Sequence, residues 1–445
     1  MIKTNNIFIK TNIPAPGTNK ILKSISKYES RSMHGQLPIV WKKAKNFNIF
    51  DHKGNKYIDF TSTIFVTNIG HSNMKLKKKL IQLINKDLLH SYAYANTIKL
   101  QYIKKLISMT KGDFDKVFLL SAGTEATEAA LKLMRLYGQS INKKKIGLIC
   151  LEGNWHGRTM GAQLMSGNEN QKKWIGQKDK NIFHLPFPYP WVLEKQKKTP
   201  EEFLLDSLKK FKIKFDLSKD ICGVMLETFQ GWGALFYPKS YIKLLNKICK
   251  KNKILLCFDE MQSGFGRTGK LFGYENYDVK PDLICCGKGM GGGVPISGVL
   301  GKKNIMDLPE VGNMSSTHSS NPLSSTAGLV VLEEIKTKNI LKNTKIKSKV
   351  LFQFLNKIKV KNKKHIIHID GRGLIAGIIF KPGEKINQNL KKVCMECMKN
   401  GLLVVYTGRE SIKIGPPLTI SIEALKEGLE ILDKSISKVF NESKY

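Results

Sequence analysis

The sequence lacks the long apolar runs that are typical of membrane proteins. None of its apolar runs approaches the roughly 18 residues that a membrane-spanning helix needs. The opening stretch, MIKTNNIFIKTNIPAPGTNK, has no apolar core followed by a cleavage site, so we expect no signal peptide. We therefore expect no membrane partner.

Cysteine is scarce, and its spacing does not indicate a metal site. Of the 8 cysteines, only Cys394 and Cys397 form a C-x-x-C pair, without a second pair or a histidine nearby. Two thiols buried in a helical segment are the simpler interpretation. We expect no bound metal, and this cysteine usage favours a reduced, cytoplasmic protein.

Acidic residues are outnumbered by basic ones. The chain has 36 Asp and Glu against 74 Lys and Arg, which gives a formal net charge of +38. A basic surface of this kind could bind nucleic acid. However, the lysines are spread along the whole chain, and few aromatic residues alternate with them as a stacking platform would require. We therefore interpret the charge as a solvated surface and expect no nucleic-acid partner.

Short apolar runs alternate with helical patterns through the middle of the chain. The runs at 116–120, 146–151, 221–226, 254–258 and 283–286 have the length of buried strands. Their spacing predicts an α/β fold with a mainly parallel sheet covered by helices on both faces. Ligands bind beyond the carboxyl ends of the strands in such sheets, so one pocket could collect the polar residues that follow these runs.

Three parts are expected along the 445 residues. Residues 1–65 would form an N-terminal arm and a segment that packs with the smaller domain. Residues 66–325 would form the large ligand-binding domain, and residues 326–445 a small α+β domain. In this last part we expect strands in HIIHIDGRGLIAGIIF, a helix near 385–400, a strand at 402–406 and a final helix from residue 422.

Gly123 and Thr124 stand at a junction between a strand and a helix. In KVFLLSAGTEATEAALKLMR, an apolar strand leads through a glycine turn into a helix with one apolar face. The N–H groups at the positive end of such a helix can cradle a phosphate. The same pattern often only begins a helix, and neither a Walker loop nor a dinucleotide fingerprint is present.

Asp259 and Lys288 each follow an apolar strand. In ILLCFDEMQSGFGRTGKLFG, a buried Asp259 needs a partner such as a protonated ring nitrogen, a helix end or Arg267. Lys288 lies among glycines in PDLICCGKGMGGGVPISGVLG. If its amine is desolvated, its pKa would be lowered and it could react with an aldehyde. The alternative is an ordinary lysine on the surface. Trp155 of EGNWHGRTMGA could stack on a flat ring or belong to the core.

Five segments of the chain resemble, in their order, the motifs of the class III aminotransferases. They are SAGTEATEAA, NWHGRT, DEMQSGFGRTG, GKGMGGGVP and THSSNP. These pyridoxal-phosphate enzymes of fold type I include the 4-aminobutyrate, acetylornithine and ornithine aminotransferases. The resemblance runs from about residue 34 to residue 420. It implies a seven-stranded type of sheet in the large domain, with a smaller α+β domain formed by the C-terminus and the N-terminal segment.

The resemblance implies that four residues contact the cofactor ring. Lys288 would hold pyridoxal phosphate as a Schiff base and move the proton during catalysis. Asp259 would pair with the pyridine nitrogen, and Gln262 would contact the phenolic oxygen of the ring. Trp155 stands where the family usually has Phe or Tyr stacked on the ring.

The resemblance also implies a phosphate site shared between two subunits. Gly123 and Thr124 would bind the phosphate, and Thr317 would reach the phosphate of the neighbouring subunit. A homodimer with shared active sites is therefore expected. Glu227, in the strand before the QG turn, would line the same site.

The substrate region departs from the family pattern. Many relatives have a Glu after the QG turn that pairs with an Arg in the C-terminal domain, but here the two positions are Trp232 and Lys413. Lysine remains a cation but lacks the bidentate fork that matches a carboxylate. Arg409 is close in sequence and is a candidate replacement. The pair that recognises glutamate and 2-oxoglutarate in relatives is thus changed at both positions.

The sequence predicts a transaminase that moves an amino group from an ω-amino acid, diamine or related amine to a keto acid or aldehyde. Another reaction on the same scaffold stays open, such as that of an aminomutase of the glutamate-1-semialdehyde type, a racemase or a decarboxylase, because the cofactor serves each of them. A more distant alternative is a basic nucleic-acid-binding protein that has kept the fold without catalysis.

Overall fold

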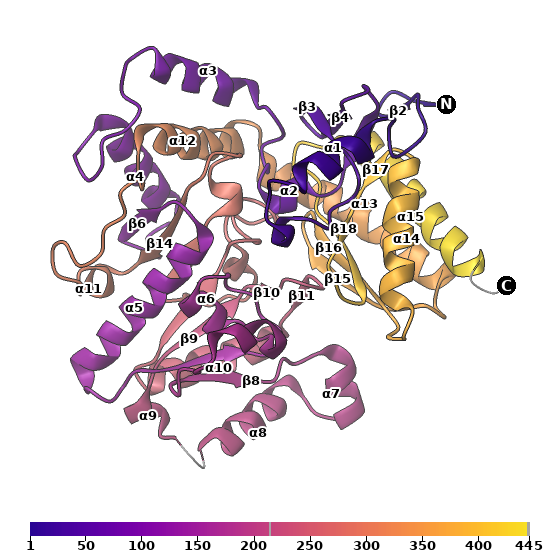
Figure 1. Ribbon diagram of the computed structural model, residues 1–445. Helices are drawn as coiled ribbons and strands as arrows, with labels where there is room; N and C mark the ends of the chain where they lie inside the picture. The colour runs from indigo at the N-terminus through magenta and orange to yellow at the C-terminus, as the bar shows by residue number, and fades with distance from the viewer. Residues whose placement is uncertain (213–214, 443–445) are drawn as a thin grey trace. The chain divides into compact units, whose positions relative to one another are not determined.

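The computed structural model describes residues 1–212 and 215–442 and divides into two compact units (Figure 1). The large unit comprises Lys75–Gly231 and Leu235–Lys338. The small unit comprises Met1–Met74, Trp232–Ala234 and Asn339–Tyr445. None of the helices in the described ranges is long and apolar enough to cross a membrane.

A seven-stranded sheet forms the core of the large unit. Its strands lie in the spatial order β6 (Lys116–Leu120), β14 (Ser297–Gly301), β13 (Leu283–Cys286), β12 (Leu255–Asp259), β9 (Ile221–Glu227), β7 (Gly147–Leu151) and β8 (Ile182–Leu185). All neighbouring pairs are parallel except the two that involve β14. The expected mainly parallel sheet is confirmed.

Helix α5 (Gly123–Ile141) packs against one face of this sheet, beside β9, β13 and β14 (Figure 1). Leu255 and Cys257 of β12 belong to the buried apolar cluster beneath α5. They are two residues apart, as expected for side chains on one face of a strand. All of β12 is buried, as a central strand of a covered sheet must be. The helix contributes the following apolar residues: Ala126, Ala130, Leu133 and Met134.

Shorter elements complete the large unit. A two-stranded ribbon, β10 (Phe229–Gln230) with β11 (Leu235–Phe236), follows β9. The helices are α3 (Met74–Ile84), which begins at the boundary, α4 (Thr97–Met109), α6 (Met160–Met165), α7 (Pro190–Gln196), α8 (Pro200–Lys212), α9 (Leu217–Asp220), α10 (Lys239–Lys251), α11 (Lys303–Met306) and α12 (Pro322–Thr337).

The small unit contains two further sheets. One has the order β1 (Ile2–Lys3), β2 (Phe8–Ile9), β5 (Lys56–Asp59), β4 (Asn48–Asp51) and β3 (Trp41–Lys45), with β17 (Leu402–Leu403) parallel to β5. The other is antiparallel and has the order β15 (Ile366–Arg372), β16 (Ile375–Phe380), β19 (Ser411–Ile414) and β18 (Val405–Tyr406).

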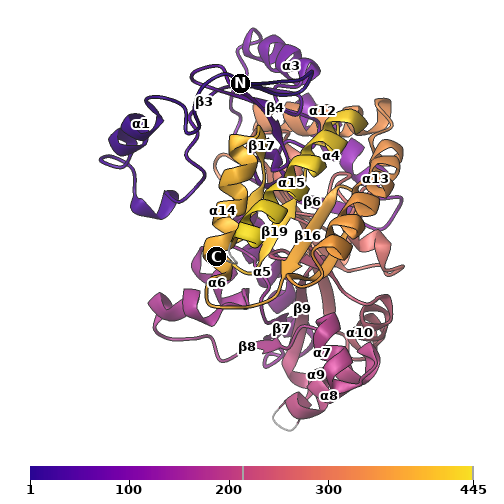
Figure 2. The ribbon, with the colours of Figure 1, turned by 90° about the vertical axis from the view of Figure 1, so that its right-hand side faces the viewer.

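Long helices accompany these sheets in the small unit. Figure 2 shows α13 (Ile340–Lys361), α14 (Ile386–Lys399) and α15 (Ile422–Glu442) in front of β16 and β19. Two shorter helices, α1 (Thr18–Ile25) and α2 (Ser62–Phe65), lie in the N-terminal part. The expected strand at 402–406 is two strands, because β17 pairs with β5 in one sheet whereas β18 pairs with β19 in the other.

Candidate active site

Three polar residues meet at the carboxyl ends of adjacent strands in the large unit. Asp259 ends β12 and stands in register with Glu227, the last residue of β9. On its other side, Asp259 is in register with Cys285 of β13, the strand that leads into Lys288. This is the edge of the sheet at which the sequence predicted a pocket.

Asp259 is buried, with 4% of its surface exposed, and its carboxylate has two described donors. The Nδ1 atom of His156 lies 2.9 Å from Oδ2, and the backbone N–H of Met261 donates to Oδ1 at 3.0 Å. Because a carboxylate only accepts hydrogen bonds, Nδ1 of His156 carries the proton. This pairing offsets much of the cost of burying the charge.

His156 is a residue that the sequence interpretation missed, although it directly follows Trp155 in the NWHGRT motif. Its backbone is fixed by Ser166, which accepts from the N–H at 2.8 Å, and by Thr127, which donates to the carbonyl at 2.9 Å. Its buried Nε2 has no hydrogen-bond partner among the described residues. His156 and Asp259 are 103 residues apart in the chain, so no local sequence pattern indicates that they are paired.

Glu227 is also buried, and its carboxylate accepts hydrogen bonds from several groups of the site. Its Oε2 accepts from the backbone N–H groups of Trp155 at 2.9 Å and Gly231 at 3.2 Å, and its Oε1 accepts from the Gln262 amide at 3.2 Å. Burial is the main cause that raises the pKa of Glu227 to about 7, and the nearby Asp259 carboxylate raises it further. His156 and the two backbone donors act in the opposite direction.

Lys288 begins a short 3-10 turn directly after β13 and is half-buried. Its backbone φ of 24° lies in the left-handed region, which a non-glycine residue rarely adopts and which is frequent at functional sites. Burial lowers the pKa of its amine, whereas the carboxylates of Asp259 and Glu227 act to raise it. The alternative of an ordinary surface lysine is therefore not the arrangement in the structure.

The start of α5 supplies a possible anion site. Gly123 is the first residue of the helix, and the Thr124 hydroxyl lies 2.5 Å from the Thr159 hydroxyl. A Cβ atom at Gly123 would lie 2.9 Å from the Met261 sulfur, and one at Gly287 would lie 2.5 Å from the same atom. A side chain at either position would require the Met261 side chain to shift, and glycine at 123 leaves the helix N-terminus accessible to a ligand.

Trp155 and Arg158 form a stacked pair at the same edge. Trp155 is half-buried, and the exposed guanidinium of Arg158 lies 4.6 Å from the centre of its indole ring. Arg158 was missed in the sequence, where it reads only as part of NWHGRT. A guanidinium on an aromatic face keeps its edge donors available for a carboxylate.

Thr317 is not joined to this cluster by any hydrogen bond among the described residues. It lies on an exposed loop before α12, and its carbonyl accepts from Nε2 of His90 at 2.9 Å. The rings of His90 and His318 also touch at 5.5 Å between centroids. Thr317 therefore contacts the segment around His90 at the exposed surface of the large unit.

The predicted substrate residues Trp232, Arg409 and Lys413 lie in the small unit. The Arg409 guanidinium stacks 3.8 Å above the Trp232 ring, and the Ser411 hydroxyl donates to the Trp232 carbonyl at 2.7 Å. Lys413 is buried in β19, with its amine 4.7 Å from the centre of the Phe65 ring. The predicted replacement cation thus contacts the aromatic residue that occupies the family's Glu position.

The cluster in the large unit fits pyridoxal phosphate. The amine of Lys288 has a lowered pKa, as attack on an aldehyde requires. Asp259 is a buried carboxylate that can hold a proton on a ring nitrogen, and the helix N-terminus at Gly123 suits a phosphate. No group of three or more metal-ligating side chains occurs in the residues that the structure describes.

The titration of Glu227 predicts a pH dependence of stability. Since its pKa is raised from 4.5 to about 7, the stability that Glu227 contributes is fully present below pH 4.5 and is lost as the pH rises through about 7. Relative to a Glu227→Gln variant, the free energy of urea unfolding of the apoenzyme should fall by about 3 kcal/mol between pH 4.5 and pH 8. Parallel pH profiles for the two proteins would contradict the assignment.

Comparisons with known proteins agree with this site. A family model described as aminotransferase class-III matches residues 29–436. The acetylornithine aminotransferase of Clostridium acetobutylicum is 32% identical over 425 residues, which cover 93% of this chain and 100% of that protein. The leucine/methionine racemase of Thermococcus litoralis is 32% identical over 414 residues, covering 90% of this chain and 91% of the racemase.

The fold is shared with solved structures as well. The crystal structure of the ornithine aminotransferase from Toxoplasma gondii ME49 superposes with a TM-score of 0.83 at 24% identity, covering 98% of this chain and 97% of that one. The match to the family model spans most of the chain, and the expected transaminase is confirmed. The chain therefore belongs to the class III aminotransferase family of pyridoxal-phosphate-dependent enzymes of fold type I.

Proposed function

We propose that Lys288 is the catalytic residue of this transaminase and that it holds pyridoxal phosphate covalently. Its lowered amine pKa supports both a nucleophilic role and the transfer of a proton at the reacting carbon. When bound, pyridoxal phosphate supplies an electron sink for the bonds at that carbon. The position of Lys288 beside Asp259 and Glu227 is the observation that carries this proposal.

Asp259 and His156 would control the protonation of the cofactor ring. We infer that Asp259 faces the ring nitrogen and that His156 acts as a positioning residue. The hydrogen bond of 2.9 Å orients the carboxylate. An ionised Asp259 would hold a proton on the ring nitrogen, and a protonated pyridine ring accepts electrons best.

The remaining cofactor contacts are proposed from the same geometry. Trp155 would stack on the ring, Gln262 would contact its phenolic oxygen, and Gly123 with Thr124 would bind the phosphate. Both Trp155 and Gln262 hydrogen-bond to the Glu227 carboxylate, so Glu227 would fix their positions. This supports a role for Glu227 in arranging the site.

We also propose a homodimer in which Thr317 reaches the phosphate of the neighbouring subunit. The support is the surface around Thr317, where apolar side chains are exposed on adjoining segments. Val311 is fully exposed, and the chain between α3 and α4, which contributes His90, exposes further large apolar residues. They are Leu88, Leu89, Tyr92 and Tyr94. Exposed apolar surface of this extent is typical of an interface.

For the substrates, we propose that an ω-amino acid donates its terminal amino group to a keto acid. The names of relatives that act on acetylornithine support this donor class. Arg158 is proposed to bind the donor carboxylate, because its exposed guanidinium stacks on Trp155 and offers a bidentate fork. Arg409, Trp232 and Lys413 are proposed as further substrate residues. A cytoplasmic location and the absence of a nucleic-acid partner stay predictions.

A racemase is the second candidate, because a relative with that name covers 90% of this chain. The two reactions differ in one requirement. A transaminase needs a separate amino acceptor for continued turnover, whereas a racemase returns the amino group to the same carbon skeleton.

Lys288→Ala should abolish covalent attachment of the cofactor and reduce transamination by about 100-fold or more. After borohydride reduction, mass spectrometry should find the cofactor on Lys288 in the wild-type enzyme and on no residue in the variant. Lys303→Ala, an exposed lysine of α11, is the matched control and should behave like the wild type. Full activity of the Lys288→Ala protein would contradict the proposal.

A matched donor pair tests the reaction and the role of Arg158. With pyruvate or 2-oxoglutarate as acceptor, Arg158→Ala should raise KM for 4-aminobutyrate about tenfold or more and leave KM for butylamine, which lacks the carboxylate, nearly unchanged. Turnover should stop when the acceptor is omitted. Acceptor-independent inversion of leucine or methionine would favour the racemase, and an equal effect on both donors would contradict the role of Arg158.

A further inference from the structure

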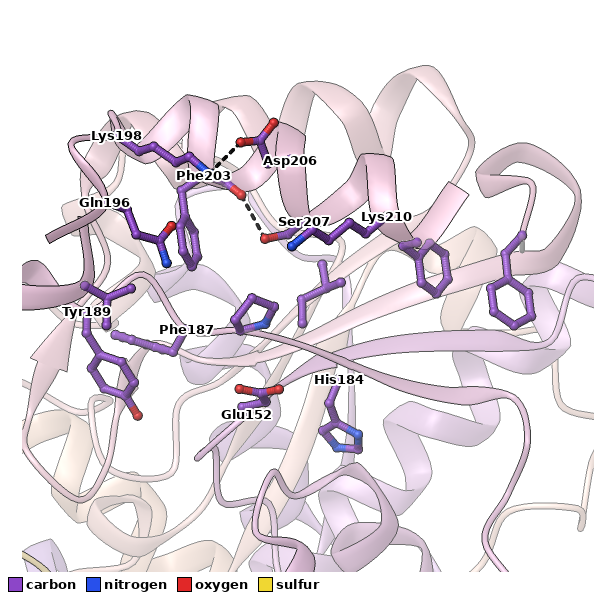
Figure 3. Close-up of a pocket in the computed structure, with 15 residues that line it drawn as sticks. Glu152, His184, Phe187, Tyr189, Gln196, Lys198, Phe203, Asp206, Ser207 and Lys210 are labelled. Carbon is purple, nitrogen blue, oxygen red and sulfur yellow. Dashed lines mark hydrogen bonds and ion pairs between the residues drawn. The ribbon is translucent and has the colours of Figure 1, made fainter. Parts of the chain in front are cut away.

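A second pocket lies in the large unit and shares no lining residue with the proposed cofactor site (Figure 3). Its volume is ≈ 540 Å³, which is in the range of small-molecule sites. The walls come from the ends of β7 and β8, from the segment that follows β8, and from α8. All of these elements belong to one unit.

Aromatic rings form the apolar part of the pocket. Phe187, from the segment after β8, and Phe203, from α8, are both buried and line the cavity. The Phe187 ring is fixed by Tyr189 and Tyr237, each 4.8 Å away between centroids. Such rigid rings offer a flat surface to an apolar or aromatic group of a ligand.

Two charges of opposite sign face this apolar part. Figure 3 shows Lys210 reaching over the pocket from α8 and Glu152 on the opposite side, at the end of β7. Neither forms an ion pair with another residue in the described ranges 1–212 and 215–442. Both side chains are exposed, so each is accessible to a separate charge of a ligand.

The other titratable groups of the pocket add no net charge. Lys198 and Asp206 form an ion pair of 2.8 Å on the rim. His184 is kept neutral, because burial and the adjacent Lys172 lower its pKa to about 4. The pocket therefore has one cation, Lys210, and one anion, Glu152, in addition to its aromatic rings.

We propose that this pocket binds the zwitterion of an α-amino acid with an apolar side chain. The carboxylate would face Lys210, the ammonium group would face Glu152, and the side chain would lie on Phe187 and Phe203. A neutral molecule would use neither charge, and a singly charged one would use only one of them. A zwitterion is thus the ligand class that matches both the charges and the rings.

The wall of this pocket is linked to the proposed cofactor site through the turn after β7. The carbonyl of Glu152 accepts from the Gln230 amide at 2.7 Å, and Trp155 follows three positions later in the chain (155 − 152). The pocket is nonetheless a separate site, because its charged residues belong to neither the Lys288 cluster nor the Trp232 region.

Calorimetric titration of the cofactor-loaded enzyme with L-phenylalanine tests the proposal. Phenethylamine lacks the carboxylate and 3-phenylpropanoate lacks the ammonium group, so each should bind about tenfold more weakly than L-phenylalanine. Lys210→Glu should weaken binding of L-phenylalanine about tenfold and should not weaken phenethylamine. Glu152→Gln should weaken L-phenylalanine and should not weaken 3-phenylpropanoate.

Lys209→Glu is the matched control, because Lys209 is exposed on the same helix and does not line the pocket. It should bind L-phenylalanine like the wild type, and all three variants should keep the wild-type transaminase kcat. The proposal is overturned if L-phenylalanine does not bind, or if Lys210→Glu and Glu152→Gln bind it as the wild type does. The second result would mean that the amino acid binds elsewhere, such as beside Lys288, and would leave the proposed transaminase intact.

Discussion

Asp259 carries a negative charge to the buried end of β12, and a bare carboxylate in that place would be costly. The surrounding residues are arranged around this constraint. His156 donates to the carboxylate from one side, and the backbone of Met261 donates from another. The Met261 side chain lies so close to Gly123 and Gly287 that a Cβ atom at either position would require it to shift. The helix N-terminus and the turn that carries Lys288 are thus held next to the same carboxylate.

Glu227 is the second buried carboxylate of the site, and its interactions differ from those of Asp259. It stands in register with Asp259 on the adjacent strand, so two carboxylates share one low-dielectric region. Burial, with the nearby Asp259 carboxylate, raises the pKa of Glu227 to about 7. Glu227 then holds the backbone of Trp155 and the amide of Gln262. The two acids thus have different partners: Asp259 accepts from His156, whereas Glu227 holds Trp155 and Gln262 in position.

Much of the fold could be predicted from the sequence because its signals are local. The apolar runs ending at Asp259 and before Lys288, and the helix after Gly123, have clear periods and clear ends. The antiparallel direction of β14 and the division of 402–406 between two sheets depend on pairing partners far away in the chain. Such pairings leave no mark on the local pattern.

The same limit applies to the site. The strand-end residues were found because acids and lysines after apolar runs are unusual, but His156 and Arg158 are polar residues in a turn-like motif and were passed over. The stacking of Arg409 on Trp232 joins the β18–β19 segment to a short stretch after β10, and only the folded chain brings them together. The pocket between Glu152 and Lys210 likewise forms from segments of ordinary composition.

The central claim is that an ionised Asp259, oriented by His156, keeps the ring nitrogen of the cofactor protonated. ¹⁵N NMR of the enzyme loaded with pyridoxal phosphate labelled at that nitrogen measures this directly. In the wild-type enzyme the signal should be that of a protonated pyridine and should not titrate between pH 6 and pH 9. In Asp259→Asn it should move to the position of a neutral pyridine. The same protonated signal in both proteins, or a neutral signal in the wild type, would contradict the account.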